Sequence, residues 1–250
     1  MSQETILVTG AAGGVGSTAR VAIAILLEQG HCIRAMVRKL DARADALRDL
    51  GAEVVVADML DIVAVRAAMR GCSVVYFTMS VSPNYLEAAA NVAVTAKSLG
   101  VKAFVNLSQM TVSQMSETET TSSPQQKQHW LAGQMLRWSG LPVVYLRPTA
   151  CKVYELTGPQ SLTMAQFAQE FSGALGRTIQ YVNVPPQIWE AKLQEAQLPA
   201  HLIAHLITMA QLHRDNRYDR MTDSFQQLVG RAPISAAEFA RRHAAAFTPG

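Results

Sequence analysis

The chain has 250 residues, of which 49% are hydrophobic and 16% charged, and its formal net charge is +3. These values are typical of a folded globular protein and exclude a disordered or fibrous chain. The charges form no basic patch of the kind that nucleic-acid binding requires. The longest aliphatic run, Val21–Leu27, is far shorter than the roughly 20 residues of a membrane span, and the N-terminus lacks the features of a secretion signal. We therefore expect a cytoplasmic protein with neither a nucleic-acid nor a membrane partner.

The first 147 residues alternate short β-branched runs with longer amphipathic stretches, which is the pattern of consecutive βαβ units. The predicted strands are Thr5–Thr9, Cys32–Val37, Glu53–Ala57, Ser73–Phe77, Lys102–Leu107 and Pro142–Leu146. The predicted helices are Val15–Gln29, Ala42–Leu50, Ile62–Met69, Tyr85–Leu99 and Gln125–Ser139. A glycine follows each helix where a left-handed cap residue would sit, namely Gly30, Gly51, Gly71, Gly100 and Gly140. This regularity predicts a doubly wound parallel sheet.

Two stretches depart from the alternation. Residues 109–128 are rich in Ser, Thr and Gln, so we expect an exposed loop at the carboxyl edge of the sheet, either a mobile flap over a site or a plain surface loop. After Arg147 the expected helices are Met164–Leu175, Pro186–Gln197, Ala200–His213, Ser224–Val229 and Ala236–Phe247, with one strand at Thr178–Val184. We therefore predict an α/β Rossmann-type domain at residues 1–150 and a smaller, mostly helical substrate-side lobe at residues 151–250 that is not an independent domain.

A glycine-rich turn follows the first predicted strand and opens the first predicted helix, with the spacing Gly-x-x-Gly-x-x-Gly. The first glycine permits a sharp turn, the second lets the backbone approach a pyrophosphate, and the third permits close packing of helix on sheet. A Gly-rich turn without a ligand is the alternative. Because more strands and helices follow it, we interpret the turn as a dinucleotide site. Its candidate binding residues are Gly10, Ala12, Gly13, Gly14, Val15 and Gly16.

The end of the second predicted strand should decide which dinucleotide binds, because an acid there accepts bonds from a ribose hydroxyl and an Arg pairs with a 2′-phosphate. Arg38 and Lys39 stand there, and the first acid is Asp41, already in the approach to the next helix. Arg38, backed by Lys39, is therefore the predicted contact for the 2′-phosphate of NADP(H). After the third strand, Asp58 is a candidate partner of the adenine amino group, whereas Asp61 is placed to cap the following helix.

Further candidates for cofactor binding stand near the ends of the third, fourth and fifth predicted strands. These are Met59, Thr78, Met79, Ser80 and Ser108. Metal binding is not expected. The three cysteines are far apart, and His201 and His205 share one helix face but have no acidic residue between them.

Several motifs together resemble the NmrA-like group of atypical short-chain dehydrogenases. They are the glycine spacing, Asp58, Ser108 in Val105–Ser108, Ser139–Pro142 leading to Leu146–Thr149, Leu156–Pro159, Leu162–Thr163 and Leu175–Arg177. The resemblance spans nearly the whole chain and implies NADP(H) binding on a Rossmann-type fold. Members include quinone and dye reductases, and also proteins that bind NADP(H) without turnover and act as redox sensors in transcriptional control.

Two features depart from the family pattern. Conventional relatives use a Tyr-x-x-x-Lys pair after the serine of the fifth strand, but no Tyr lies between Ser108 and Leu141. The nearest titratable candidate is His129, which could be a proton donor, a helix-surface histidine or a flap-anchoring histidine. Gly133 stands where many relatives carry an acid or Lys. The connection from Thr149 to Tyr154 is also shorter than usual, by some tens of residues.

We therefore predict an NAD(P)H-dependent oxidoreductase, similar to quinone reductases, that transfers a hydride from NADPH to a small electrophilic substrate. A quinone is the candidate substrate, and a homo-oligomer is left open. The alternative is a non-catalytic NADP(H)-binding redox sensor that acts on transcription through a protein partner.

Overall fold

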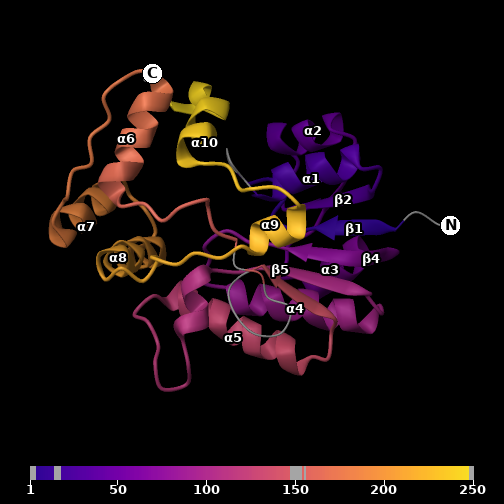
Figure 1. The fold of residues 1–250 in the computed structure, drawn as a ribbon. Coiled ribbons are helices and arrows are strands. Elements are labelled where there is room, and N and C mark those ends of the chain that lie inside the picture. The colour runs from indigo at the N-terminus through magenta and orange to yellow at the C-terminus, as the bar shows by residue number, and fades with distance from the viewer. Residues whose placement is uncertain (1–3, 14–17, 147–153, 155, 248–250) are drawn as a thin grey trace. The chain divides into compact units, whose positions relative to one another are not determined.

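The computed structural model describes residues 4–13, 18–146, 154 and 156–247. The chain divides into two compact units, Met1–Val153 and Tyr154–Gly250, each of which is described by itself (Figure 1). None of the helices in the described ranges is long and apolar enough to cross a membrane.

The first unit contains a six-stranded, fully parallel sheet in the order β3-β2-β1-β4-β5-β6. The strands are β1 Thr5–Val8, β2 Cys32–Val37, β3 Glu53–Val56, β4 Cys72–Phe77, β5 Ala103–Leu107 and β6 Val143–Leu146. All six agree with the predicted strands to within one residue at each end. The order reverses direction at β1, which pairs with both β2 and β4. The predicted doubly wound fold is confirmed.

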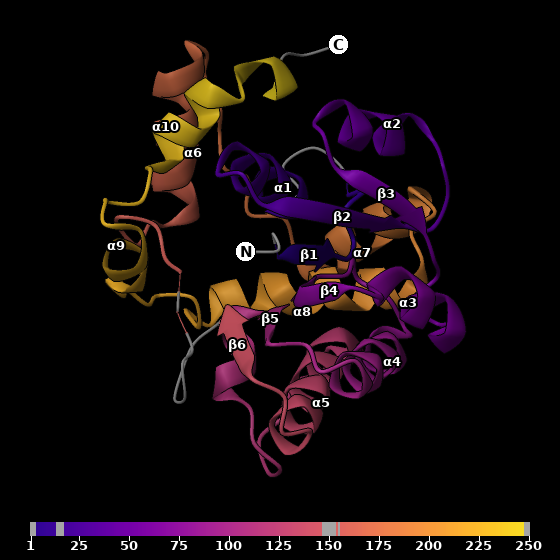
Figure 2. The same cartoon turned by 90° about the vertical axis from the view of Figure 1, so that its right-hand side faces the viewer.

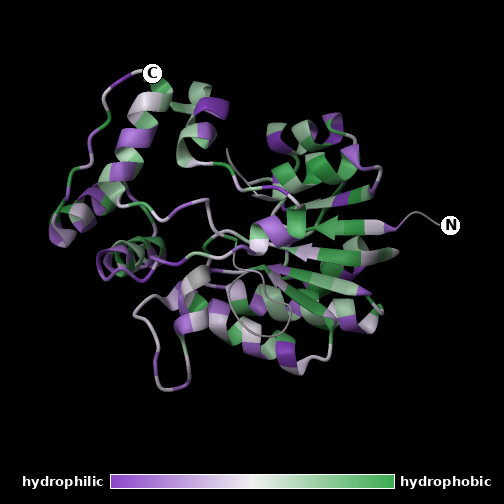
Figure 3. Cartoon of the chain, in the orientation of Figure 1, coloured by the Kyte–Doolittle hydropathy of each residue, from purple (hydrophilic) through white to green (hydrophobic). Residues whose placement is uncertain are grey.

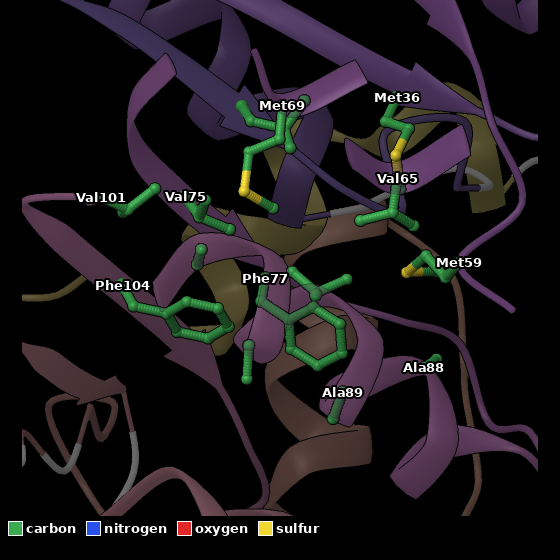
Figure 4. Close-up of a cluster of buried hydrophobic side chains, with 14 of the residues drawn as sticks. Met36, Met59, Val65, Met69, Val75, Phe77, Ala88, Ala89, Val101 and Phe104 are labelled. Carbon is green, nitrogen blue, oxygen red and sulfur yellow. The ribbon is translucent and has the colours of Figure 1, made fainter. Parts of the chain in front are cut away.

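Helices cover both faces of this sheet, as Figure 2 shows from one end. They are α1 Thr18–Glu28, α2 Ala42–Asp49, α3 Ile62–Met69, α4 Tyr85–Ser98 and α5 Pro124–Trp138. One core cluster joins the sheet to α1 and α2, and the other joins it to α3, α4 and α5 (Figure 4). The strands are accordingly hydrophobic along most of their length (Figure 3).

Local sequence signals fix the ends of these helices. Asp61 caps α3, since its Oδ1 accepts hydrogen bonds from the backbone N–H groups of Val63 and Ala64 at 2.9 and 3.1 Å. All five glycines predicted to follow helices have positive φ angles, from 64° to 100°. Short-range chemistry therefore sets the length of each βα unit and hence the position of each strand end.

The polar segment at 109–128 differs from its prediction as an exposed loop. It forms the 3₁₀ helix η1 Met110–Gln114 and the start of α5, and Thr111 is buried. The Gln126 amide donates to Thr111 Oγ1 at 2.7 Å, and the Trp130 indole N–H donates to the Met115 carbonyl at 3.2 Å. The segment buries itself because its polar side chains satisfy one another, which a count of apolar residues does not reveal. Among the residues of this segment whose burial the structure describes, 116–120 and 122 are exposed, as are Pro124 and Lys127 within α5.

The second unit is helical in its described part, with α6 Met164–Leu175, α7 Pro186–Glu195, α8 Ala200–Arg214, α9 Ser224–Val229, α10 Ala236–Arg242 and the 3₁₀ helix η2 Ala244–Phe247. The strand predicted at Thr178–Val184 is wrong. Instead of a neighbouring strand, the Ser172 hydroxyl serves both backbone groups of Ile179, donating to its carbonyl at 3.1 Å and accepting from its N–H at 2.8 Å. Aromatic contacts among Phe167, Phe171 and Phe247 join α6 to the end of the unit.

Candidate functional site

The candidate site lies along the carboxyl edge of the parallel sheet. Ligands of doubly wound folds bind outside the carboxyl ends of the strands, where the strand order reverses. In this chain that point lies between β1 and β4. The turns after β1, β2, β3, β4 and β5 therefore carry the candidate residues.

The glycine-rich turn after β1 is held tightly against the end of β4. The Thr9 hydroxyl, fully buried, donates to the Thr78 carbonyl at 2.8 Å and accepts from the Thr78 N–H at 3.0 Å. Gly10 has a φ of +62°, and a Cβ there would lie 2.6 Å from the Thr78 carbonyl oxygen. Only glycine fits this position without a shift of the backbone. The Gly13 N–H then bonds the Gly10 carbonyl at 3.3 Å and closes the turn.

The rest of the predicted glycine motif, Gly14, Val15 and Gly16, lies outside the described residues, as do Arg147–Val153, where the short connection was predicted. The described part of the motif is nevertheless the part that requires the sharp turn. It fits a dinucleotide phosphate by its position at the strand-order reversal and by the absence of a side chain at Gly10 and Gly13.

On the β2 and β3 side, the predicted cations are exposed. Arg38 and Lys39 make no hydrogen bond or ion pair with any residue of the described ranges. Asp58 is also exposed, and its Oδ1 accepts from the Leu60 N–H at 3.0 Å, which closes its own turn. The Met59 side chain packs in the core. The predicted roles of these residues toward a cofactor stay predictions.

A further arginine, which the sequence reasoning missed, reaches the glycine-rich turn. Arg43 Nη1 donates to the carbonyl of Ala12 at 3.1 Å, while Nη2 lies 2.6 Å from Asp41 Oδ2. Asp41 also caps α2, accepting from the Arg43 N–H at 3.0 Å. The hydrogen bond from the Arg43 side chain lowers the pKa of Asp41 to about 2. The available signal was the Asp41-x-Arg43 spacing at the start of a helix, which keeps the two side chains together.

On the β4 and β5 side, the candidate residues are less exposed than the cations after β2. His129 of α5 is only 5% exposed, and its ring centroid lies 3.8 Å from that of the fully buried Tyr85. Ser108, just after β5, places its Oγ 3.4 Å from His129 Nδ1. The interpretation of His129 as a surface histidine is therefore wrong, because the packing of α4 against α5 encloses it. Thr78 and Met79 are half-buried, and Ser80 is exposed.

Two buried amides near this pair were not expected from the sequence. Asn106 is 1% exposed and pairs in register with Phe77 and Tyr145, so its side chain lies on the face that α4 and α5 cover. Neither of its amide atoms has a hydrogen-bond partner among the described residues, and the same holds for the Gln125 Nε2 atom. Gln125 accepts from the Ser82 N–H at 3.0 Å. Buried groups of this kind are costly unless water or a ligand satisfies them, so they add hydrogen-bonding capacity beside the Ser108–His129 pair.

The histidines of α8 do not form a second site. Burial, followed by the charge of His201, lowers the pKa of His205. Across the described ranges, no group of three or more His, Cys, Asp and Glu side chains is arranged to hold a metal ion.

Comparisons with known proteins agree with this geometry. Residues 13–174 match the model of the NAD(P)H-binding family. The chain is 24% identical to the NAD(P)H azoreductase of Xenophilus azovorans over 293 aligned positions, covering 97% of this chain and 99% of that protein. A stretch of 93 residues is 30% identical to the uncharacterized oxidoreductase YesF of Bacillus subtilis, covering 37% of this chain and 32% of that protein.

Among solved structures, an NADPH-dependent quinone oxidoreductase from Escherichia coli in complex with NADPH is similar, with a TM-score of 0.75 and 21% identity. The match covers 97% of this chain and 100% of that one. The alignment with the azoreductase is longer than the 250 residues of this chain, so that relative contains residues that this chain lacks.

The sheet and the glycine-rich turn define a dinucleotide-binding α/β protein of the Rossmann type. The chain belongs to the NAD(P)H-binding family, whose model matches more than half of its length. The family match confirms the NAD(P)H binding that the resemblance to the NmrA-like group implied, and the fold is similar to that of a solved NmrA mutant, with a TM-score of 0.70, 14% identity, and coverage of 97% of this chain and 96% of that one.

Proposed function

We propose that this protein is an NADPH-dependent reductase of a small electrophilic molecule, with quinones as the substrate class. The observation that carries the proposal is the contact of the half-buried Ser108 with the buried His129, with an Oγ to Nδ1 distance of 3.4 Å, at the same sheet edge as the glycine-rich turn. The names of the azoreductase and of the quinone oxidoreductase among the similar proteins support a reductase.

The chain's own residues fit a dinucleotide along this edge. In the turn from Gly10 to Gly13 the two glycines leave the backbone accessible to the phosphates, and Arg38 stands after β2 for the adenosine end. The residues after β4 and β5 are then left for the nicotinamide end, since β4 and β5 lie on the other side of β1. When bound, NADPH supplies the hydride.

The Ser108–His129 pair handles the proton in this proposal. A quinone that accepts a hydride becomes an anion that needs one proton. The Ser108 hydroxyl stands at the strand end to donate it. The imidazolium form of His129 then returns a proton from Nδ1 to the Ser108 oxygen and ends as a neutral imidazole, which water reprotonates before the next turnover. Burial of His129 against Tyr85 fixes the ring, so that no reorganisation is needed during the reaction.

The absence of a Tyr-x-x-x-Lys pair favours quinones over alcohols or simple ketones. An alkoxide is a strong base and needs a strong acid next to it, whereas a hydroquinone anion is a weak base that a hydroxyl and imidazole pair can protonate. A quinone is also planar, so it can stack on the nicotinamide and be held at short range. The proposal includes a small-molecule substrate and a cytoplasmic location, as expected from the sequence.

Purified protein assayed with NADPH and a panel of benzoquinones and naphthoquinones tests the proposal. We expect NADPH oxidation well above the rate without protein for at least one quinone. Tight NADPH binding with no turnover on the whole panel would instead support the non-catalytic redox sensor, which the missing Tyr-x-x-x-Lys pair also allows. The His129→Phe variant, which keeps an aromatic ring against Tyr85, links any turnover to the proposed site.

A further inference from the structure

The Asp41–Arg43 pair makes more contacts than helix capping requires. Asp41 caps α2 through Oδ1 alone, which accepts from the Arg43 N–H. Its second oxygen, Oδ2, bonds the Arg43 side chain at 2.6 Å from Nη2 and 3.2 Å from Nε. The same guanidinium reaches back across 31 residues to the Ala12 carbonyl at 3.1 Å. These additional bonds tie the segment after β2 to the glycine-rich turn after β1.

The position of this pair is where the adenosine half of a dinucleotide must lie. Ala12 stands between Gly10 and Gly13, which face the phosphates in the proposed function. The Arg43 side chain is 53% exposed, and three of its five N–H groups are used by Ala12 and Asp41. It therefore keeps two donors for a further acceptor beside the turn. Arg38 is exposed and bonded to no described residue, so nothing ties its charge to the turn in the same way.

We propose that Asp41 and Arg43 together determine cofactor specificity, with Arg43 binding the adenosine 2′-phosphate and Asp41 opposing it. The inference rests on the proposed function, because it needs a dinucleotide at this edge. Guanidinium matches phosphate in a two-point contact. The Asp41 carboxylate is the acceptor that a free 2′-hydroxyl of NADH requires, and it repels a phosphate unless Arg43 neutralises it. When Arg43 shifts from Asp41 to the phosphate, the site changes from one that binds the free 2′-hydroxyl of NADH to one that binds the 2′-phosphate of NADPH.

A purely structural role for Arg43 makes a different prediction. If the guanidinium only fastened the turn to the segment after β2, its loss would weaken NADPH and NADH by the same factor, because both share the pyrophosphate. A specificity role changes the ratio of the two dissociation constants. The matched control is Arg48, which pairs with Asp45 at 2.6 Å on the exposed face of the same helix. Replacing Arg48 removes one positive charge, as replacing Arg43 does, but at a position that makes no contact with the turn.

The experiment measures dissociation constants of NADPH and NADH, without substrate, for the wild type, Arg43→Gln, Arg43→Lys, Asp41→Asn and Arg48→Gln. We expect Arg43→Gln to weaken NADPH by about tenfold or more and NADH by much less, with partial recovery in Arg43→Lys. Asp41→Asn keeps the helix cap, so it should fold, and we expect it to weaken NADH and to leave NADPH equal or tighter. Arg48→Gln should leave the ratio of the two dissociation constants unchanged.

Equal weakening of both cofactors by Arg43→Gln, or no change in the NADPH to NADH ratio in either Arg43→Gln or Asp41→Asn, overturns the inference while the proposed function stands. A wild-type protein that binds neither cofactor removes the basis of both. The unfolding temperature of each variant shows whether a loss of binding comes from a loss of folding; if Arg43→Gln does not fold, the ratio in Asp41→Asn decides.

Discussion

The two halves of the sheet's carboxyl edge carry different kinds of residue. After β1, β2 and β3 the candidate residues are backbone turns and exposed charges, such as Gly10, Arg38 and Asp58. After β5 they are less exposed: the half-buried Ser108, the buried His129 beside it, and Asn106, which is buried beneath α4 and α5. The first half suits a charged, strongly hydrated part of a ligand, and the second half suits a flat, weakly charged one. In the proposed function, one end of this edge holds the phosphates and adenosine of the dinucleotide, and the other end holds its nicotinamide together with the substrate.

The difference also sets how each half responds to change. Exposed charges act through interactions that salt and water screen, so single substitutions there should change specificity more than stability. Buried polar groups act at short range in a low dielectric, where the loss of one partner leaves another unsatisfied. Substitutions on the buried side should therefore change chemistry and stability together.

The largest expected effect is at the junction of the two halves. Gly10→Ala places a Cβ 2.6 Å from the Thr78 carbonyl oxygen in a residue with φ +62°. The left-handed conformation costs about 1 to 2 kcal/mol and the clash about 1 to 3 kcal/mol more, so we expect the free energy of unfolding to fall by about 3 kcal/mol. Urea denaturation measures it.

Gly30→Ala is the matched control for this change. Gly30 has a φ of +83°, but nothing lies within 4 Å of its added Cβ. In Gly30→Ala the free energy of unfolding should fall only by the cost of the left-handed conformation, about 1 kcal/mol. Equal losses in the two variants would show that the turn after β1 is not tightly fixed to β4.

His129→Phe tests the buried half. The phenyl ring can still pack on Tyr85, but the nitrogen beside Ser108 is lost. We expect kcat with a quinone to fall on the order of 100-fold, the usual range for loss of an acid or base, while the dissociation constant of NADPH stays within about twofold. Steady-state kinetics and a binding titration measure the two. An unchanged kcat would exclude His129 from the proton step.

Sequence reasoning succeeded where structure depends on neighbours along the chain. Gly10 and the helix cap Asp61 follow from local rules on turns and caps, and parallel strands follow from apolar runs. It failed where side chains meet across the fold. The burial of His129 depends on α4 covering α5, and the reach of Arg43 to the turn spans 31 residues. The expected strand at Thr178–Val184 finds no strand to pair with in the part of the chain that the structure describes.

Arg38→Ala tests whether Arg38, the cation predicted from the sequence, binds the 2′-phosphate in addition to Arg43. A charge-assisted bond to the 2′-phosphate contributes on the order of 1.5 to 3 kcal/mol, which corresponds to about a tenfold to hundredfold loss of NADPH affinity. NADH should be nearly unaffected, and high salt should reduce the difference, because Arg38 is exposed. Arg48→Ala, which removes a charge from the exposed face of α2, is the control for non-specific loss of charge. Equal weakening of both cofactors in Arg38→Ala would remove Arg38 from phosphate recognition.

Gln126→Ala tests whether the buried side-chain amide of Gln126 holds the segment at residues 110–115 in place. Gln126 is fully buried, and its Nε2 donates to Thr111 Oγ1 at 2.7 Å. The loss leaves a buried hydroxyl short of a partner and should cost about 1 to 2 kcal/mol of stability, with faster hydrogen exchange in η1. Lys127→Ala, exposed on the next residue, should change neither. If exchange in η1 were already as fast as in residues 116–120 of the wild type, the segment would be a loop after all.

The smallest expected effect is a change of cofactor preference with pH. A phosphate monoester has a second pKa near 6, so the 2′-phosphate of NADPH loses one of its two negative charges as the pH falls from about 7.5 to 5.5. The hydrogen bond from Arg43 holds the pKa of Asp41 at about 2, so Asp41 stays ionised over this whole range, and arginines stay charged. The attraction between the 2′-phosphate and the arginines therefore weakens only because the phosphate loses charge. We expect the preference for NADPH over NADH to fall about fivefold or less, while the affinity for NADH stays constant. Binding titrations of both cofactors at several pH values measure this. A parallel fall in NADH affinity would mean that a group of the protein, and not the 2′-phosphate, titrates in this range.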